Sequence, residues 1–159
     1  LNRQISESRV SQDEDHLKEI LDRGDNGDTP AKIRREMGVT MNDYAAVFRT
    51  TEGMEIAREK LKELKDRYQS VPVQDKGRIF NTNVIFALEL GFMLDCAETI
   101  VVSALERKES RGAHFMAEYP QRDDENWMKH ISVQSTADGP KLGYMPVIVT
   151  QWEPQIRSY

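Results

Sequence analysis

Residues 84–105 constrain the possible folds most, because apolar side chains fall on almost every side of a helix drawn over them. They are Val84, Ile85, Phe86, Leu88, Leu90, Phe92, Met93, Leu94, Ile100, Val101 and Val102. A helix of this kind is either central in a bundle or crosses a membrane. Glu89, Asp95 and Glu98 would each cost about 2 kcal/mol or more in lipid. We therefore predict a central bundle helix that begins near the Asn81-Thr82 cap, and no membrane span.

Two amphipathic helices are predicted before that segment. Thr29-Pro30 is an N-cap followed by proline in the first turn, where the missing N–H costs nothing. The apolar residues of the first helix recur at helical spacing and are Ile33, Met37, Met41, Tyr44 and Phe48, with a weak point at Gly38. Residues 50–52, Thr-Thr-Glu, start the second helix. Its apolar stripe is Met54, Ala57, Leu61, Leu64 and Tyr68, and it ends at Val71-Pro72.

Residues 1–28 form a predicted acidic linker that contains a short helix. They hold four basic and eight acidic side chains, and so account for nearly all of the formal net charge of −5. Leu17, Ile20 and Leu21 have helical spacing, which predicts an amphipathic helix over residues 13–23. Neither a signal peptide nor a transit peptide is indicated at the start. Because the first residue is not Met, we expect a fragment of a longer polypeptide.

The helical period stops after the apolar segment, and two strand-like runs follow. Residues 130–133 and 144–150 flank Asp138-Gly139-Pro140, which is turn chemistry. The fold class predicted is mainly α. It consists of a three-helix antiparallel bundle, spectrin-repeat-like, over residues 29–109, followed by an extended C-terminal arm with a β-hairpin over residues 110–159. We expect the arm and the bundle to form one structural unit.

Composition and motifs exclude several function classes. The chain is acidic, with an isoelectric point of about 5.3, so we expect no nucleic-acid partner. None of the nine glycines belongs to a G-x-G-x-x-G motif or a phosphate loop, so no self-contained nucleotide or flavin site is predicted. The single cysteine, Cys96, excludes an internal disulfide. Since it lies in the apolar helix, we interpret it as packing material rather than a nucleophile. No catalytic residue is assigned.

A polar cluster follows the apolar segment and raises the hypothesis of a metal site. His114 and His130 flank three carboxylates at residues 123–125, and a metal-dependent hydrolase would use such groups. However, three consecutive acids point in different directions, and acids before Asn-Trp are typical of the first turn of a short helix. We therefore expect no metal. His16 lies among acids, and a solvated role is predicted for it.

The same cluster mixes arginine with aromatic side chains, a composition that interface cores favour. One interpretation is that these residues hold the arm on its own bundle. The interpretation we prefer is that the arm docks onto another domain. The docking residues predicted are Arg111, His114, Arg122, Asp123, Asp124 and Trp127.

A series of motifs carries a resemblance to a known family. In chain order they are VFRTTEG (47–53), DKG (75–77) with FNT (80–82), ALEL (87–90), MLD (93–95) with AE (97–98), SALERKESRGAH (103–114), YP (119–120), RDDENWMKH (122–130) and YMPV (144–147). Over roughly Pro30 to Tyr159 the sequence resembles the C-terminal domain of the succinate dehydrogenase/fumarate reductase flavoprotein subunit. L-aspartate oxidase shares the ESRG element, but residues 122–130 are more similar to the succinate/fumarate branch. Met116-Ala117 departs from the family, in which an arginine and an acid often stand there.

The resemblance implies a parent oxidoreductase that serves the tricarboxylic acid cycle and electron transport. Such an enzyme interconverts succinate and fumarate and passes electrons through FAD to an iron–sulfur subunit and a quinone. In that family FAD and the catalytic residues lie in the preceding FAD-binding and capping domains, so this chain alone is expected to be inactive and to hold no cofactor. The sequence leaves the direction of the reaction and covalent attachment of the flavin open.

A structural and docking role is therefore implied for this chain, against the FAD-binding and capping domains of its parent. The parent subunit is expected to be peripheral, on the cytoplasmic, inner face of the cell membrane, where a membrane anchor holds the complex. A free-standing helical protein-interaction module is the alternative function.

Overall fold

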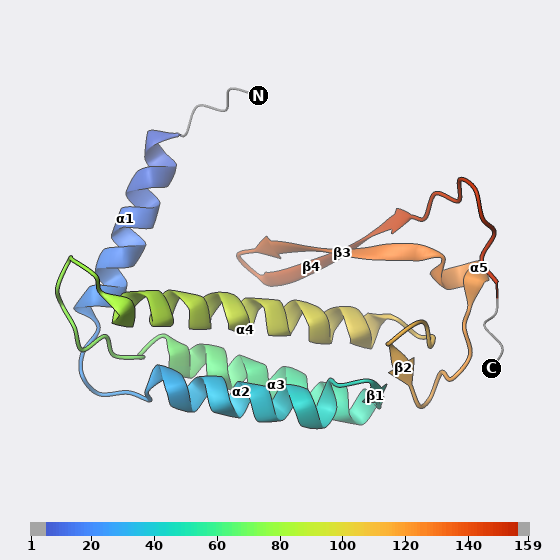
Figure 1. The fold of residues 1–159 in the computed structure, drawn as a ribbon, viewed down its shortest axis with the longest axis horizontal. Coiled ribbons are helices and arrows are strands. Elements are labelled where there is room, and N and C mark those ends of the chain that lie inside the picture. Colours follow the sequence, from blue (N-terminus) through green and yellow to red (C-terminus); the bar gives the residue numbers. More distant parts are fainter. Residues whose placement is uncertain (1–5, 156–159) are drawn as a thin grey trace.

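The computed structural model describes residues 6–155, and its elements confirm the predicted fold class. In chain order they are α1 (Glu7–Asp22), α2 (Pro30–Tyr44), β1 (Phe48–Arg49), α3 (Thr51–Tyr68), α4 (Thr82–Glu106), β2 (Phe115–Met116), α5 (Asp124–Trp127), β3 (Lys129–Thr136) and β4 (Gly139–Pro146). Helices α2, α3 and α4 lie side by side with alternating direction, and the β3–β4 hairpin of the arm stands over α4 (Figure 1). Across residues 6–155, none of the helices is both long enough and apolar enough to span a bilayer.

Each bundle helix begins at the cap that the sequence predicts. The side-chain oxygens of Thr29, Thr50 and Asn81 accept hydrogen bonds from the backbone N–H three residues further along, at 3.2, 3.0 and 3.0 Å. These bonds satisfy N–H groups that have no partner inside the helix. Local sequence therefore determines where α2, α3 and α4 start.

The core lies between the facing sides of α2, α3 and α4. All five residues of the predicted α3 stripe are buried, and they pack with Ile33 and Met37 of α2. The inner face of α4 completes this core with Leu90, Leu94, Ala97, Val101 and Ala104, all of which are buried. Phe48 was predicted to belong to the first helix, but α2 ends at Tyr44 and Phe48 is an exposed residue of β1.

The N-terminal helix is longer than the sequence predicts. Helix α1 covers Glu7–Asp22, where the apolar spacing indicated residues 13–23. Its buried residue Ile20 packs with Val73 and with Ala87 of α4, so α1 lies on the N-terminal end of α4. The first five residues of the predicted linker and the last four of the predicted arm lie outside the described residues.

The hairpin forms where predicted, but its second strand is displaced. Strand β4 runs from Gly139 to Pro146, whereas residues 144–150 were expected. Thr136 pairs with Gly139 around the turn at residues 137–138, and the positive φ of 103° falls on Gly139, directly after that turn. A left-handed glycine in this position is typical of a hairpin turn followed by a glycine bulge. The second strand therefore starts directly at Gly139. It ends at Pro146, which has no N–H for the ladder.

The outward face of α4 corrects a second expectation. Cys96 was predicted to be packing material, but it is exposed. Phe92 and Ile100 on the same helix are exposed as well. The apolar residues of α4 are distributed all round, and α2 and α3 cover only one side of it. Within the described part of the chain, α4 is therefore central to the bundle but not fully covered.

Two helical glycines give opposite predictions. Gly38 does not interrupt α2, and a Cβ added there would meet nothing within 4 Å. Gly38→Ala should therefore stabilise the fold by about 0.5–1 kcal/mol. At Gly91 in α4 a Cβ would lie 2.7 Å from the buried Tyr68 hydroxyl and 2.9 Å from its ring, so Gly91→Ala should destabilise by about 1–3 kcal/mol. Urea-induced unfolding measures both changes, and a shift of the same sign in the two variants would contradict this packing.

Candidate functional site

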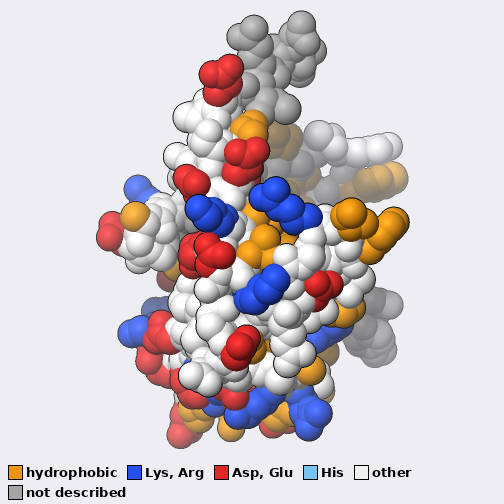
Figure 2. Space-filling view, turned by 90° about the vertical axis from the view of Figure 1, so that its left-hand side faces the viewer, with side chains coloured by type: hydrophobic (Ala, Val, Ile, Leu, Met, Phe, Trp, Pro, Cys, Tyr) orange, Lys and Arg blue, Asp and Glu red, His pale blue; other side chains and the backbone are white. Residues whose placement is uncertain are grey.

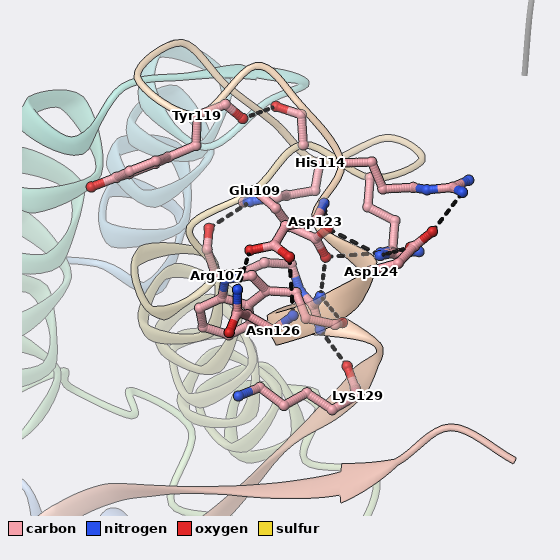
Figure 3. Close-up of polar contacts among 12 residues, drawn as sticks. Arg107, Glu109, His114, Tyr119, Asp123, Asp124, Asn126 and Lys129 are labelled. Carbon is pink, nitrogen blue, oxygen red and sulfur yellow. Dashed lines mark hydrogen bonds and ion pairs between the residues drawn. The ribbon is translucent and has the colours of Figure 1, made fainter. Parts of the chain in front are cut away.

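Glu109 is a fully buried carboxylate just beyond the end of α4, and it is the centre of the candidate site. Oε1 accepts hydrogen bonds from Arg107 Nη1 at 2.5 Å and from Arg111 Nε at 2.8 Å. Oε2 accepts from Arg111 Nη2 at 3.0 Å and from the backbone N–H of Asp123 at 2.9 Å. In Figure 3, Arg107 and Asp123 lie next to Glu109; Arg107 comes from the end of α4 and Asp123 from the segment before α5. Burial of the charge is tolerated because both oxygens are paired and hydrogen-bonded.

A second carboxylate, Asp124, extends the network to α5 and to the end of the described chain. Arg111 Nη2 donates to Asp124 Oδ1, and Arg122 Nη2 donates to Oδ2, both at 2.6 Å. Arg122 also donates to the Gln155 carbonyl at 2.6 Å. As predicted, the acids open a short helix: Asp123 caps α5 by accepting from the N–H of Asn126 at 3.0 Å.

Arg107 connects the end of α4 to the start of the hairpin. Its guanidinium donates to the carbonyls of Trp127 and Lys129, at 3.1 and 2.6 Å, in addition to Glu109. It also lies 5.4 Å from the centre of the Trp127 ring. The Lys129 ammonium lies 4.5 Å from the centre of that ring and 4.2 Å from the centre of the Tyr144 ring, so one cation contacts both aromatic groups.

His114 joins the arm to the junction between α2 and α3. Arg49 Nη1 lies 2.7 Å from His114 Nδ1, and Nε2 lies 3.2 Å from the Arg107 carbonyl. Arginine can only donate, so Nδ1 is the acceptor and Nε2 carries the proton. Burial lowers the pKa of His114, and the positive charges of Arg49 and Arg107 lower it further. The imidazole is thus neutral and oriented by both partners.

Strand pairing and Ser110 hold the loop between α4 and α5. Strand β2 pairs in parallel with β1, with Phe115 opposite Phe48. The Ser110 hydroxyl donates to the Tyr119 carbonyl at 2.7 Å and accepts from the Met116 N–H at 3.0 Å. The loop that carries His114 is therefore fixed at several points.

All six predicted docking residues lie in or beside this network. Arg111, Arg122, Asp123, Asp124 and Trp127 are half-buried around Glu109, and His114 is half-buried on the Arg49 side. Sequence reasoning missed the role of Glu109 as the hub and the role of Arg107. The alternation Arg107-x-Glu109-x-Arg111 was the available signal, because residues two apart in an extended segment share a side.

Residues 6–155 contain neither a cluster of metal-ligating side chains nor the glycine-rich loop of a dinucleotide-binding site. Among residues 6–155 no group of three or more His, Cys, Asp or Glu side chains could hold a metal ion. His130 is exposed, while both nitrogens of His114 have partners. An FAD site of the dinucleotide-binding type needs a glycine-rich loop between a parallel strand and a helix. The only parallel pair in residues 6–155, β1 with β2, is two residues long and has no such loop.

Fold and site together define a class of protein: a helical-bundle domain whose C-terminal arm is fastened by a buried carboxylate between arginines. The chain belongs to the family described as the fumarate reductase flavoprotein C-terminal domain, whose model matches residues 34–159.

Relatives in both branches of that family are similar to the chain. A fumarate reductase flavoprotein subunit of Haemophilus influenzae is 40% identical over 142 residues, which are 89% of this chain and 24% of the relative. A succinate dehydrogenase flavoprotein subunit of Rickettsia conorii is 40% identical over 152 residues, 91% of this chain and 26% of the relative. A solved quinol fumarate reductase chain of E. coli superposes with a TM-score of 0.89 at 36% identity, covering 97% of this chain and 27% of that chain. The chain thus spans about a quarter of the length of these relatives.

Removing the charge of Glu109 should loosen the arm. Glu109→Gln leaves Arg107 and Arg111 without their carboxylate, and loss of one partner of a buried ion pair costs about 3 kcal/mol. Glu125→Gln on α5 is the matched control, since Glu125 is exposed. Urea-induced unfolding should show the loss for Glu109→Gln alone. Equal stability of the two variants would mean that the cluster does not hold the arm.

The difference in unfolding free energy between the native chain and Glu109→Gln should depend on pH in one direction. Burial raises the pKa of Glu109, but hydrogen bonds from Arg111, the Asp123 backbone and Arg107 outweigh it, so the pKa lies below its ordinary 4.5. The stabilisation is therefore fully present above about pH 4.5 and is lost as the pH falls through the folded-state pKa. The stability gap between the native chain and Glu109→Gln should narrow only below that pH. A gap that narrows already near neutrality would contradict this assignment.

Proposed function

We propose that this chain acts as the C-terminal helical domain of a flavoprotein subunit that interconverts succinate and fumarate with bound FAD. In that subunit it braces the FAD-binding and capping domains and takes no part in the chemistry. The observation that carries this proposal is the combined match in sequence and shape, at 36% identity and a TM-score of 0.89, to about a quarter of a quinol fumarate reductase chain. The family model describes the C-terminal part of such proteins.

The arm is the part of the chain that we assign to docking. Arg111, His114, Arg122, Asp123, Asp124 and Trp127 are its proposed docking residues. Because the Glu109 cluster uses many of their donors and acceptors internally, they act by holding the arm in one shape. Exposed side chains around them, such as Tyr119 and Trp152, then face the neighbouring domain. Aromatic groups presented on a rigid support are typical of interface hot spots.

The wider assembly follows from the same proposal. The parent subunit passes electrons to an iron–sulfur subunit, and a membrane anchor holds the complex on the cytoplasmic, inner face of the cell membrane. Solved relatives include a quinol-fumarate reductase with menaquinol molecules and a mycobacterial Sdh1 with UQ1. Both descriptions name a quinone-type molecule, which supports a quinone-linked membrane complex.

The size and flavin content of the natural polypeptide test this function. An antibody to this chain should detect, in extract of the source cell, a band about four times larger than 18.3 kDa, because the chain covers 24% of its relative. The purified band should contain flavin and reduce a dye with succinate, whereas the 159-residue chain alone should do neither. A single flavin-free band near 18.3 kDa would instead support a free-standing interaction module. Flavin and activity in the isolated chain would contradict the structural role.

A further inference from the structure

The outward face of α4 is largely apolar and exposed, and Glu89 is an exposed charged residue among its apolar side chains. Ile85, Phe86, Phe92 and Ile100 have exposed fractions of 51, 55, 64 and 48%, and Cys96 is exposed among them. Single exposed apolar residues are common on proteins, but contiguous apolar patches mark interaction surfaces. Ile85, Phe92, Cys96 and Ile100 follow one another at spacings of seven, four and four, so these four residues share one side of the helix.

This face lies between two raised elements. Helix α1 packs on the N-terminal end of α4, and the hairpin stands over its C-terminal half, where Thr99, Ser103, Ile131 and Val133 line a common groove. In Figure 1 a gap separates α1 from the hairpin along the middle of α4.

The apolar surface continues from α4 onto α2. Met37, Met41 and Met93 line a groove together with Phe92, Cys96 and Ile100, and Glu89 is the only charged residue among those that line it. Methionine side chains are flexible and polarizable, so they adapt to the shape of a partner surface. A groove with this lining is suited to a tightly packed apolar partner rather than to a charged ligand.

The loop before α4 carries a second exposed apolar feature. Ile79 and Phe80 are 80 and 96% exposed, and Phe80 has a φ of 53°, a left-handed conformation that a bulky residue rarely adopts. Asn81 fixes the loop by donating to the carbonyls of Asp75 and Gly77 at 2.6 and 2.8 Å. The described contacts give no internal reason for the strain at Phe80, and such strain concentrates at functional sites. Figure 2, which views this end of the molecule, shows hydrophobic side chains among charged ones.

We propose that the outward α4 face, defined by Ile85, Phe86, Phe92, Cys96 and Ile100, is the seat for the part of the parent polypeptide that precedes the bundle. This inference rests on the proposed function, because the relatives are about four times as long as the chain and the family model describes their C-terminal part. An occupant in the same polypeptide suits an apolar, methionine-rich surface, since permanent interfaces resemble a domain core. A second copy of the chain is the competing occupant, and a two-fold interface of that kind would need a self-complementary patch.

Cys96 reports directly on this occupant. In the purified full-length subunit, maleimide labelling of Cys96 is followed by peptide mass spectrometry, with Glu59→Cys as the control. Glu59 is an exposed residue on the outer side of α3. We expect the labelling rate of native Cys96 to be about a tenth of the rate of the control thiol, or lower, because a covered thiol reacts only after local opening. In denaturant both thiols should label at the same rate.

A matched pair of variants shows whether the apolar face causes the protection. Ile85→Glu places a charge on the face, and Ile56→Glu places one on α3 at similar exposure, 51 against 45%. Ile85→Glu should raise the Cys96 labelling rate about tenfold towards that of the control thiol, and Ile56→Glu should leave it unchanged. Circular dichroism should show the same helix content in both, because each replaced side chain is already exposed.

Dilution and flavin content separate the remaining outcomes. Protection that is independent of protein concentration and survives removal of the other subunits supports the intramolecular occupant. Protection that is lost on dilution or on stripping those subunits overturns it in favour of a second copy or a partner subunit. If the subunit holds flavin but Cys96 labels as fast as the control, this inference fails while the proposed function stands. Absence of flavin and of succinate-dependent activity overturns both.

Discussion

A helix that is apolar on all sides must be covered on all sides, and this constraint organises the whole chain. Helices α2 and α3 bury the inner face of α4 through Leu90 and Leu94, α1 covers its N-terminal end, and the hairpin approaches its C-terminal half. The elements α1, β3 and β4 thus extend the cover of one helix. Within the described residues, the cover of α4 is incomplete around Phe92. This exposed face is the part of the helix that we assign to contact with the rest of the parent protein.

The Glu109 cluster converts the end of that helix into a fixed support for the arm. One buried carboxylate gathers two arginines and a backbone N–H, and through Arg111 it reaches Asp124 on α5. Buried ionic groups add little net stability compared with apolar packing, but they penalise every arrangement that leaves a charge unpaired. The cluster therefore restricts the arm to one position on the bundle. For a domain that braces others, that restriction matters more than the energy of the pairs.

Sequence reasoning succeeded where structure is determined locally. The caps at Thr29, Thr50 and Asn81 and the α3 stripe depend on neighbours a few residues away, so spacing and residue type were sufficient. It failed where the decisive partner is distant in sequence. Phe48 leaves the helix to pair with the arm 67 residues later, and the role of Glu109 appears only when the chain folds back. Cys96 was misassigned because an apolar helix was assumed to be covered by this chain alone.

The structure of the full-length subunit, determined by crystallography or electron microscopy, tests the central claim most directly. The account predicts that residues preceding the bundle in the same polypeptide contact Ile85, Phe92 and Ile100 and exclude water from them. It also predicts that the arm keeps the Glu109–Arg111 ion pair seen here at 2.8 Å. An α4 face that remains open to solvent, with the preceding domains seated elsewhere, would contradict the account.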